Sequence, residues 1–187
     1  GTSGAPTASG TLAVCQERGL PLAVTSGMGG IGDLKHEALC PDLPALRDIP
    51  VALISTAPKD MLDIPATLAW LREAGVAVWG VGTDRCTGYL FHCADLPLEG
   101  DWGLRPLPPD HRRLLLLQPI PEKQRVADDS LLEQGIAAGK AAEAAGREYH
   151  PAANAAFDRL TGGHSSRIQL QSLIANARLA ARLTGDN

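Results

Sequence analysis

Short apolar runs that alternate with helical patterns constrain the fold of this chain most strongly. The strand-like runs cover residues 20–25, 50–55, 76–81 and 114–117. Helical patterns cover residues 7–18, 60–74, 129–145, 151–160 and 165–183. Such alternation is typical of βαβ units, in which helices cover buried parallel strands. The sequence therefore predicts one α/β domain over residues 1–187, a three-layer α/β/α arrangement with a largely parallel central sheet.

Two segments interrupt this alternation. Residues 33–47 are polar and contain prolines, and residues 85–113 have little periodicity and several prolines. Pro-rich segments without a hydrophobic period are typical of irregular structure. We expect residues 85–113 to form an irregular loop or lid.

Composition and charge narrow the class of protein. Of the 187 residues, 44% are hydrophobic and only 4% aromatic, which fits an α/β core packed with Ala, Leu and Val. The net charge of −4 argues against a nucleic-acid partner, which would favour a basic face. No apolar stretch approaches the roughly 20 residues of a membrane span. The cysteines are scattered without a C-x-x-C pair, which is typical of reduced thiols and predicts a cytoplasmic protein (Cys15, Cys40, Cys86 and Cys93).

A glycine-rich loop follows the first predicted strand. Gly27, Gly29 and Gly32 satisfy G-x-G-x-x-G, and glycines in such a loop let backbone N–H groups approach a phosphate. A phosphate or sugar-phosphate loop and a plain tight turn are both open interpretations. Dinucleotide binding is the weakest, because prolines interrupt the following helix and Ser55 and Thr56 stand where an acidic residue would hold a ribose.

Lys59 is the first candidate for chemistry. It follows strand 50–55, and ligands of open α/β folds collect at the carboxyl ends of strands. With a helix predicted over residues 60–74, Lys59 would lie in its first turn, where a cation opposes the helix dipole. A desolvated lysine becomes a neutral amine that attacks an aldehyde to form a Schiff base. The alternative interpretation is a solvated surface lysine.

Five segments in order carry a resemblance to a known family. They are Ser26 to Gly32, Val51 to Leu68 around the lysine, Val78 to Asp84, Pro119 to Glu122, and Leu160 to Ser165 with Asn176 to Ala180. Together they resemble the pseudouridine-5′-phosphate glycosidase family, which includes the indigoidine synthase A-like proteins. The resemblance covers about Gly4 to Leu183 and is most specific around Lys59.

The resemblance implies an activity and a site. Lys59 falls on the lysine that forms an imine with C1 of ring-opened ribose 5-phosphate, in the reversible cleavage of a C–C glycosidic bond that yields uracil. The residues expected near the sugar phosphate are Gly27, Gly29, Gly30, Ser55, Thr56, Asp42 and Gln169. The implied partners are a small sugar phosphate or C-nucleotide, and the implied assembly is a homo-oligomer, a trimer in the family.

The chain also departs from the family pattern. The family has a further N-terminal third with a catalytic glutamate and a second lysine, so pairing with a separate N-terminal half is expected as an alternative to a homo-oligomer. The first aspartate of a D-I-S-A-D-L motif, a manganese ligand in the family, corresponds to Ala38, while Asp42 matches the second aspartate. No metal ligand is therefore predicted, with Glu37 as a weak candidate. Gln118 and Gln169 stand at positions of family asparagines.

Two classes of function stay open. The first is an enzyme that makes or breaks a C-glycosidic bond, retuned to its own substrate. The second is a catalytically degenerate binding or scaffold subunit. The presence of Lys59 after an intact strand and turn favours the enzyme. The replacement of the metal-binding aspartate by Ala38 favours the binding or scaffold subunit.

Overall fold

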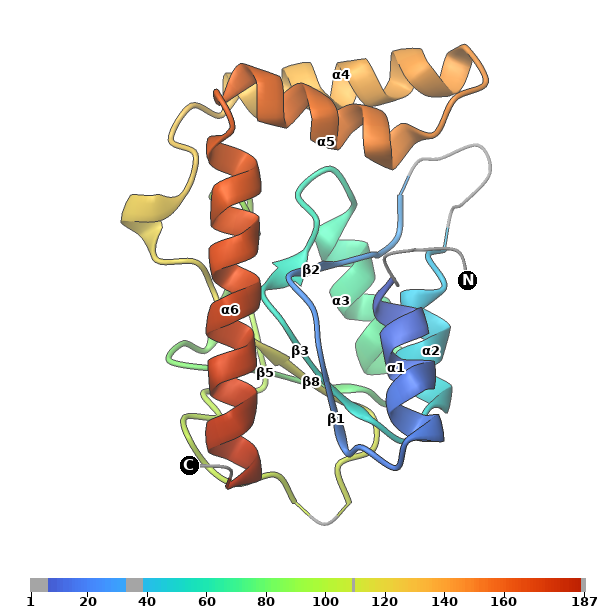
Figure 1. Cartoon of the computed structure of the whole chain (residues 1–187), viewed down its shortest axis with the longest axis vertical. Coiled ribbons are helices and arrows are strands. Elements are labelled where there is room, and N and C mark those ends of the chain that lie inside the picture. Colours follow the sequence, from blue (N-terminus) through green and yellow to red (C-terminus); the bar gives the residue numbers. More distant parts are fainter. Residues whose placement is uncertain (1–6, 33–38, 109, 186–187) are drawn as a thin grey trace.

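A four-stranded parallel sheet forms the centre of the molecule. The computed structural model describes residues 7–32, 39–108 and 110–185 (Figure 1). The strand order is β1 (Leu22–Val24), β3 (Ala52–Ser55), β8 (Leu114–Leu117) and β5 (Ala77–Gly80), and every pair is parallel. All four strands lie within the predicted apolar runs. The predicted parallel α/β sheet is therefore confirmed.

Helices cover both faces of this sheet. One face packs against α1 (Ala8–Glu17), α2 (Asp42–Asp48) and α3 (Ile64–Glu73), and the other against the long helix α6 (His164–Thr184), as Figure 1 shows. Successive strand residues point to opposite faces, so Leu53 and Leu115 join the larger core while Ile54 and Leu116 pack towards α6. The three-layer arrangement follows from strands that are apolar on both faces.

No helix among the described residues combines the length and apolar character needed to cross a membrane. The cytoplasmic location inferred from the cysteine pattern stays a prediction.

Helix α3 begins later than the sequence pattern indicated. The helix was expected from residue 60, but the Asp63 carboxylate caps α3 by accepting the Ala66 N–H at 2.9 Å, and Pro65 occupies its first turn. Lys59 therefore lies on a connection before the helix, and the expectation that it opposes the dipole of α3 is wrong. The polar segment before residue 48 also contains α2, a short helix that its prolines did not indicate.

Residues 85–113 contain more structure than the expected loop. Strands β6 (Arg85–Cys86) and β7 (Leu96–Pro97) pair antiparallel, and the turn between them buries Tyr89, Leu90 and Phe91 in the core. A turn of this kind has no hydrophobic period, so the sequence pattern could not show its burial. A 3-10 helix, η1 (Glu122–Gln124), follows β8.

Helices α4 (Ser130–Ala144) and α5 (Tyr149–Leu160) pack against each other above the end of the sheet (Figure 1). Two glycines of α4 allow the close approach. A Cβ at Gly135 would lie 1.9 Å from the Phe157 ring, and one at Gly139 would lie 2.6 Å from the Tyr149 ring. The glycines therefore serve helix packing.

This packing reverses the usual effect of a glycine replacement. In an exposed helix, Gly→Ala gains about 1 kcal/mol. We expect Gly135→Ala instead to lower the free energy of unfolding by about 2 kcal/mol, because Phe157 is fully buried and also contacts Phe91. Urea unfolding measures the change, and adding Phe157→Leu should recover part of it. A stabilised Gly135→Ala variant would contradict the close packing.

Candidate active site at the carboxyl edge of the sheet

The glycine loop and Lys59 lie side by side beyond the sheet. Strand β1 is followed by β2 (Gly27–Met28), and β3 is followed by β4 (Ala57–Pro58). Strands β2 and β4 form a second parallel pair, in which Gly27 pairs with Ala57. The Lys59 N–H continues this ladder by donating to the Met28 carbonyl at 3.1 Å. Lys59 is half-exposed. Two segments that the sequence singled out separately are thus joined by backbone hydrogen bonds.

Ser26 connects this pair to α6 and to the buried turn. Its hydroxyl contacts the Tyr89 hydroxyl and the Ser172 hydroxyl, the latter at 2.7 Å, and donates to the Gln169 carbonyl at 2.9 Å. Burial raises the pKa of Tyr89 to about 12, so this phenol stays protonated at neutral pH. Gln169 enters these contacts through its backbone.

The predicted residues Ser55 and Thr56 belong to the same cluster. The Ser55 hydroxyl donates to the Ser26 carbonyl at 3.0 Å, and the Thr56 N–H donates to the same carbonyl at 2.7 Å. The Asn176 amide nitrogen donates to the Thr56 hydroxyl at 3.2 Å. Ser55, Thr56 and the Gln169 backbone therefore meet around Ser26, at the edge where Lys59 lies.

Two buried amide oxygens at this edge have no donor among the described residues. They are Oε1 of Gln118, which directly follows β8, and Oδ1 of Asn176. An unpaired buried acceptor costs about 1–3 kcal/mol, so such atoms in a site indicate a polar ligand or an ordered water. The Asn176 amide contacts Thr56, and Gln118 is joined to the neighbouring Ser55 through its backbone, its N–H donating to the Ser55 carbonyl at 2.9 Å.

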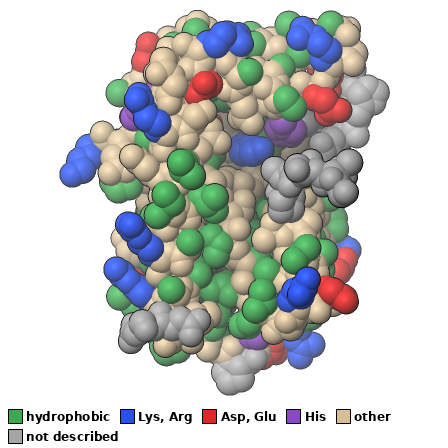
Figure 2. Space-filling model, viewed as in Figure 1, with side chains coloured by type: hydrophobic (Ala, Val, Ile, Leu, Met, Phe, Trp, Pro, Cys, Tyr) green, Lys and Arg blue, Asp and Glu red, His purple; other side chains and the backbone are tan. Residues whose placement is uncertain are grey.

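A pocket of about 410 Å³ opens beside the Lys59 connection. It lies between the residues that follow β2 and β4 and the α4–α5 pair, and Figure 2 shows the surface hollowed below that pair. Apolar and charged side chains line it (Ile31, Met61, Asp63, Ile136, Lys140 and Tyr149).

The glycines of the loop are packed against the protein's own side chains. A Cβ at Gly27 would lie 2.7 Å from the Tyr89 ring, and one at Gly29 would lie 2.0 Å from the Cys40 sulfur. A Cβ at Gly30 would lie 2.5 Å from the Thr67 hydroxyl. This side of the loop is filled, and binding of a phosphate by the loop stays a prediction.

Asp42 holds the loop in place. Its carboxylate oxygens accept the Gly29 N–H at 2.8 Å and the Ser9 N–H at 2.7 Å. The carboxylate thereby links α2 to the loop and to the first turn of α1.

Within residues 7–32, 39–108 and 110–185, the side chains do not fit a divalent cation. Both Asp42 oxygens already accept backbone N–H groups, and no group of three His, Cys, Asp or Glu side chains able to hold a metal ion occurs in the described ranges. The positions of Ala38 and Glu37 lie outside the described residues.

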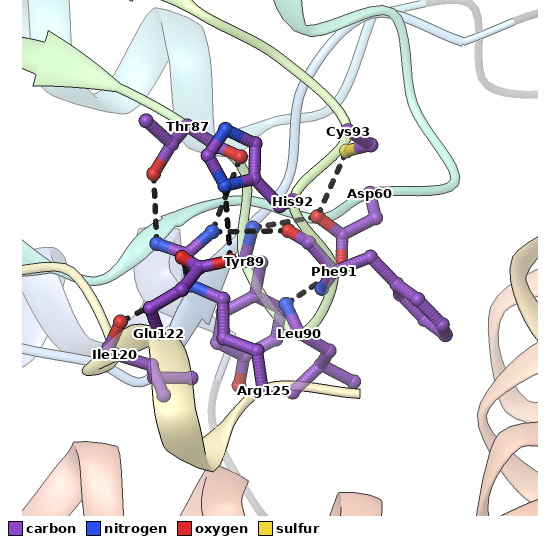
Figure 3. A network of polar contacts seen from close by, with 10 residues as sticks. All are labelled: Asp60, Thr87, Tyr89, Leu90, Phe91, His92, Cys93, Ile120, Glu122 and Arg125. Atoms are coloured by element: carbon purple, nitrogen blue, oxygen red, sulfur yellow. Dashed lines mark hydrogen bonds and ion pairs between the residues drawn. The ribbon is translucent and has the colours of Figure 1, made fainter. Parts of the chain in front are cut away.

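Asp60, the neighbour of Lys59, fixes the buried turn after β6. Its carboxylate accepts the N–H groups of Tyr89, Leu90 and Phe91, the second at 2.7 Å (Figure 3). Burial raises the pKa of the Asp60 carboxyl, and these hydrogen bonds act in the opposite direction. The side chain thus ties the residue beside Lys59 to the turn that supplies Tyr89.

Arg125 holds the same turn from the other side. Its buried guanidinium donates to the carbonyls of Ile120, Thr87 and Phe91, each at 3.1 Å, and to the Thr87 hydroxyl at 2.8 Å (Figure 3). Oε2 of Glu122 lies 3.6 Å from Nε of Arg125 and forms an ion pair with it. Asp60 thus accepts the N–H groups of the turn while Arg125 donates to its carbonyls.

The reactivity of Cys93 depends on its contact with Asp60. Cys93 is exposed, but its thiol donates to Asp60 at 3.2 Å, and partial loss of water around the sulfur, followed by the nearby carboxylate, raises the pKa of the thiol. We expect its alkylation by iodoacetamide to keep accelerating up to pH 10, because the thiolate is the nucleophile. Peptide mass spectrometry at each pH measures the rate, with glutathione as control. A plateau at about pH 9.5, as for a thiol with the usual pKa of about 8.5, would contradict the contact with Asp60.

The sequence did not single out Ser26, Asp60, Tyr89, Arg125 or the role of Asn176. Ser26 could have been found, since it follows β1 as Ser55 and Thr56 follow β3. The other four act across long sequence separations, and no local pattern indicates them.

Comparisons with known proteins agree with this architecture. The model of the family described as Indigoidine synthase A like protein matches residues 1–102. A pseudouridine-5′-phosphate glycosidase of Gemmatimonas aurantiaca is 32% identical over 98% of this chain and 64% of its own length. A protein of the same name from Thermus thermophilus is 28% identical over 98% of this chain and 68% of its own length.

Two solved structures share the fold. A prealnumycin C-glycosynthase in complex with ribulose 5-phosphate has a TM-score of 0.77 at 26% identity, covering 94% of this chain and 64% of that protein. An indigoidine synthase A-like protein of Thermotoga maritima has a TM-score of 0.77 at 19% identity. The chain spans just under two thirds of the Gemmatimonas relative and of both solved structures.

Proposed function

Because this chain belongs to the indigoidine synthase A-like family, we propose that it makes or breaks a C-glycosidic bond between a ribose 5-phosphate type sugar and a base or other aglycone. Lys59 is the proposed imine-forming residue. The observation that carries the proposal is the position of Lys59 directly after β4, bonded through its backbone to Met28 of the glycine loop, at the carboxyl edge of a parallel sheet.

The candidate site at this edge of the sheet suits a sugar phosphate. Oε1 of Gln118 and Oδ1 of Asn176 are buried acceptors that the hydroxyl groups of an open-chain sugar would satisfy. The adjacent pocket, with Met61 and Ile136 among its apolar walls and Lys140 as a cation, offers room for an aglycone. Relatives of this chain carry names that specify the same chemistry, a glycosidase of pseudouridine 5′-phosphate and a C-glycosynthase bound to ribulose 5-phosphate.

An imine is suited to this bond. The neutral Lys59 amine adds to the C1 aldehyde of the open sugar, and loss of water with uptake of one proton gives an iminium. In the synthetic direction a carbon of the aglycone attacks C1, so that a C–C bond forms, the C=N electron pair moves to nitrogen and the aglycone carbon loses its proton. A hydroxyl of the open sugar then bonds to C1 and loses its proton, while the C1–N bond breaks and the Lys59 amine leaves. The iminium thereby accepts the electron pair when the C–C bond forms, and in the reverse direction the nitrogen lone pair re-forms the iminium as the C–C bond breaks.

Turnover of pseudouridine 5′-phosphate tests the proposal. The chain is incubated with this compound, and separately with uracil and ribose 5-phosphate, and the products are followed by liquid chromatography and mass spectrometry. Formation of uracil and ribose 5-phosphate, or of the C-nucleotide, supports the proposed reaction. Absence of products in both directions, with a range of aromatic aglycones as well as uracil, would contradict it.

A binding subunit is the second candidate. Two observations favour it. The described residues contain no group of side chains able to hold a metal ion, and the protein's own side chains pack against the glycine loop. Calorimetry showing that ribose 5-phosphate binds, with no turnover of any C-nucleotide, would favour this candidate.

A further inference from the structure

The two edges of the central sheet differ. At the β5 edge the segment after β7 runs alongside the strand, with the Glu99 N–H donating to the Val78 carbonyl at 3.1 Å and the Trp102 N–H to the Gly80 carbonyl at 2.7 Å. At the other edge β1 has a strand neighbour on its β3 side alone, within the described part of the chain. An unprotected edge is a template for pairing with another strand.

The outward backbone groups of β1 belong to Leu22 and Val24. The carbonyl of Pro21 and the N–H of Thr25 bond to β3, and the backbone groups of successive residues in a strand point to opposite sides, so those of Leu22 and Val24 point away. The Leu22 carbonyl accepts the Cys15 thiol at 3.7 Å, a weak donor. This edge can therefore accept stronger hydrogen bonds from a further strand.

Exposed apolar side chains flank this edge. On α6 the exposed fractions are 59% for Leu170, 38% for Leu173 and 43% for Ile174, at helical spacing, and on the other flank 57% for Val14 and 51% for Leu20. Figure 2 shows hydrophobic side chains gathered over α6, β1 and α1. We name these five side chains with β1 the β1 face. Soluble proteins seldom gather large exposed apolar side chains on one face unless that face binds something.

The shape of the β1 face favours an inserted segment over a second copy. Helices α1 and α6 both contact β1, and Leu22 and Val24 are only half-buried between the more exposed side chains of the two helices. The strand is therefore recessed, and the β1 of a second copy, recessed in the same way, would be held off by the helices. An extended segment can enter between them.

The length of the relatives identifies this segment. The chain covers 64% of the Gemmatimonas aurantiaca glycosidase and 64% of the C-glycosynthase, whose fold it shares with a TM-score of 0.77. Each therefore has about a third of its polypeptide outside the part that this chain matches. A polypeptide of that length, belonging to a protein of the same fold, is the occupant that we infer for the β1 face.

We propose that the β1 face is a docking surface for a polypeptide equivalent to that further third, which adds a strand parallel to β1. The carboxyl end of a parallel strand beside β1 lies at the same edge as Thr25 and Ser26. The docked segment therefore reaches the candidate site around Ser26. This inference goes beyond the proposed function, because docking is measured without turnover.

The part of the Gemmatimonas aurantiaca glycosidase outside the matched span is the probe. It is supplied as a separate polypeptide and also fused to this chain through a flexible linker. We expect saturable one-to-one binding, and amide hydrogen exchange at Leu22 and Val24 slowed by about tenfold or more in both forms. Unchanged exchange in the fused form would overturn the proposal, whether or not the chain shows turnover.

Two leucines of similar exposure provide the matched variants. Leu170→Lys lies in the β1 face, while Leu104→Lys replaces a side chain that is 62% exposed on the segment between β7 and β8. We expect Leu170→Lys to weaken binding by about tenfold or more and Leu104→Lys to leave it unchanged. Equal effects of the two variants would overturn the proposal. So would self-association of the chain in sedimentation that Leu170→Lys abolishes, because a second copy would then be the occupant.

Discussion

Replacing Asp60 with alanine is expected to lower the free energy of unfolding by about 3–5 kcal/mol. The substitution leaves the N–H groups of Tyr89, Leu90 and Phe91 without an acceptor inside the protein. Each unpaired buried donor costs about 1–3 kcal/mol, with water recovering part of the loss. Urea unfolding followed by circular dichroism measures the effect.

Asp63→Ala is the matched control, since it removes a carboxylate that accepts a single N–H at an exposed helix cap. Loss of that cap should cost about 1 kcal/mol. Asp60→Asn, which keeps one acceptor oxygen, should fall between the two. If Asp60→Ala proves no more destabilising than Asp63→Ala, the turn does not depend on Asp60.

The largest effect on activity is expected from Lys59→Met, which keeps much of the apolar stem and removes the amine. Turnover of the C-nucleotide should fall by about 10³-fold or more, because the imine cannot form. Lys59 bonds to Met28 through its backbone, so the variant should fold with unchanged stability. Thermal unfolding checks that point.

Lys123→Met is the control for charge. Lys123 lies exposed on η1 and takes no part in the cluster around Ser26. Its replacement should leave turnover unchanged. Residual turnover of Lys59→Met within about tenfold of the parent would show that a different group carries the chemistry.

The parts of the fold that could be predicted are those with a local physical signal. The apolar runs over residues 50–55 and 114–117 form adjacent parallel strands because a strand buried on both faces must be apolar throughout. The break at Gly162 and Gly163 is also local, since both glycines have positive φ values of 59° and 79° that other residues rarely adopt. The position of Lys59 after a strand follows in the same way.

The start of α3 was mispredicted although its signal was local. The run from Met61 to Ala74 is amphipathic, and this periodicity outweighed the Asp63 cap and Pro65 as a guide to the boundary. This error affected the interpretation of the site, because it placed Lys59 in the first turn of α3, whereas Lys59 lies before that helix.

The assembly of the site could not be predicted, because its contacts are distant in sequence. Ser26 meets Tyr89 and Ser172, which lie 63 and 146 positions away, and Asp60 meets the turn 29 positions later. Serine, tyrosine and aspartate at these positions have ordinary local surroundings, so their roles appear only when the turn after β6 and helix α6 pack on the glycine loop.

Borohydride trapping tests the central claim most directly. The chain is mixed with ribose 5-phosphate and sodium borohydride, and its intact mass and its peptides are measured by mass spectrometry. The four lysines are Lys35, Lys59, Lys123 and Lys140, so an imine at the site is distinguishable from general glycation. The account predicts one reduced sugar phosphate on Lys59, absent in Lys59→Met and retained in Lys123→Met. An unchanged intact mass, or equal labelling of all four lysines, would contradict it.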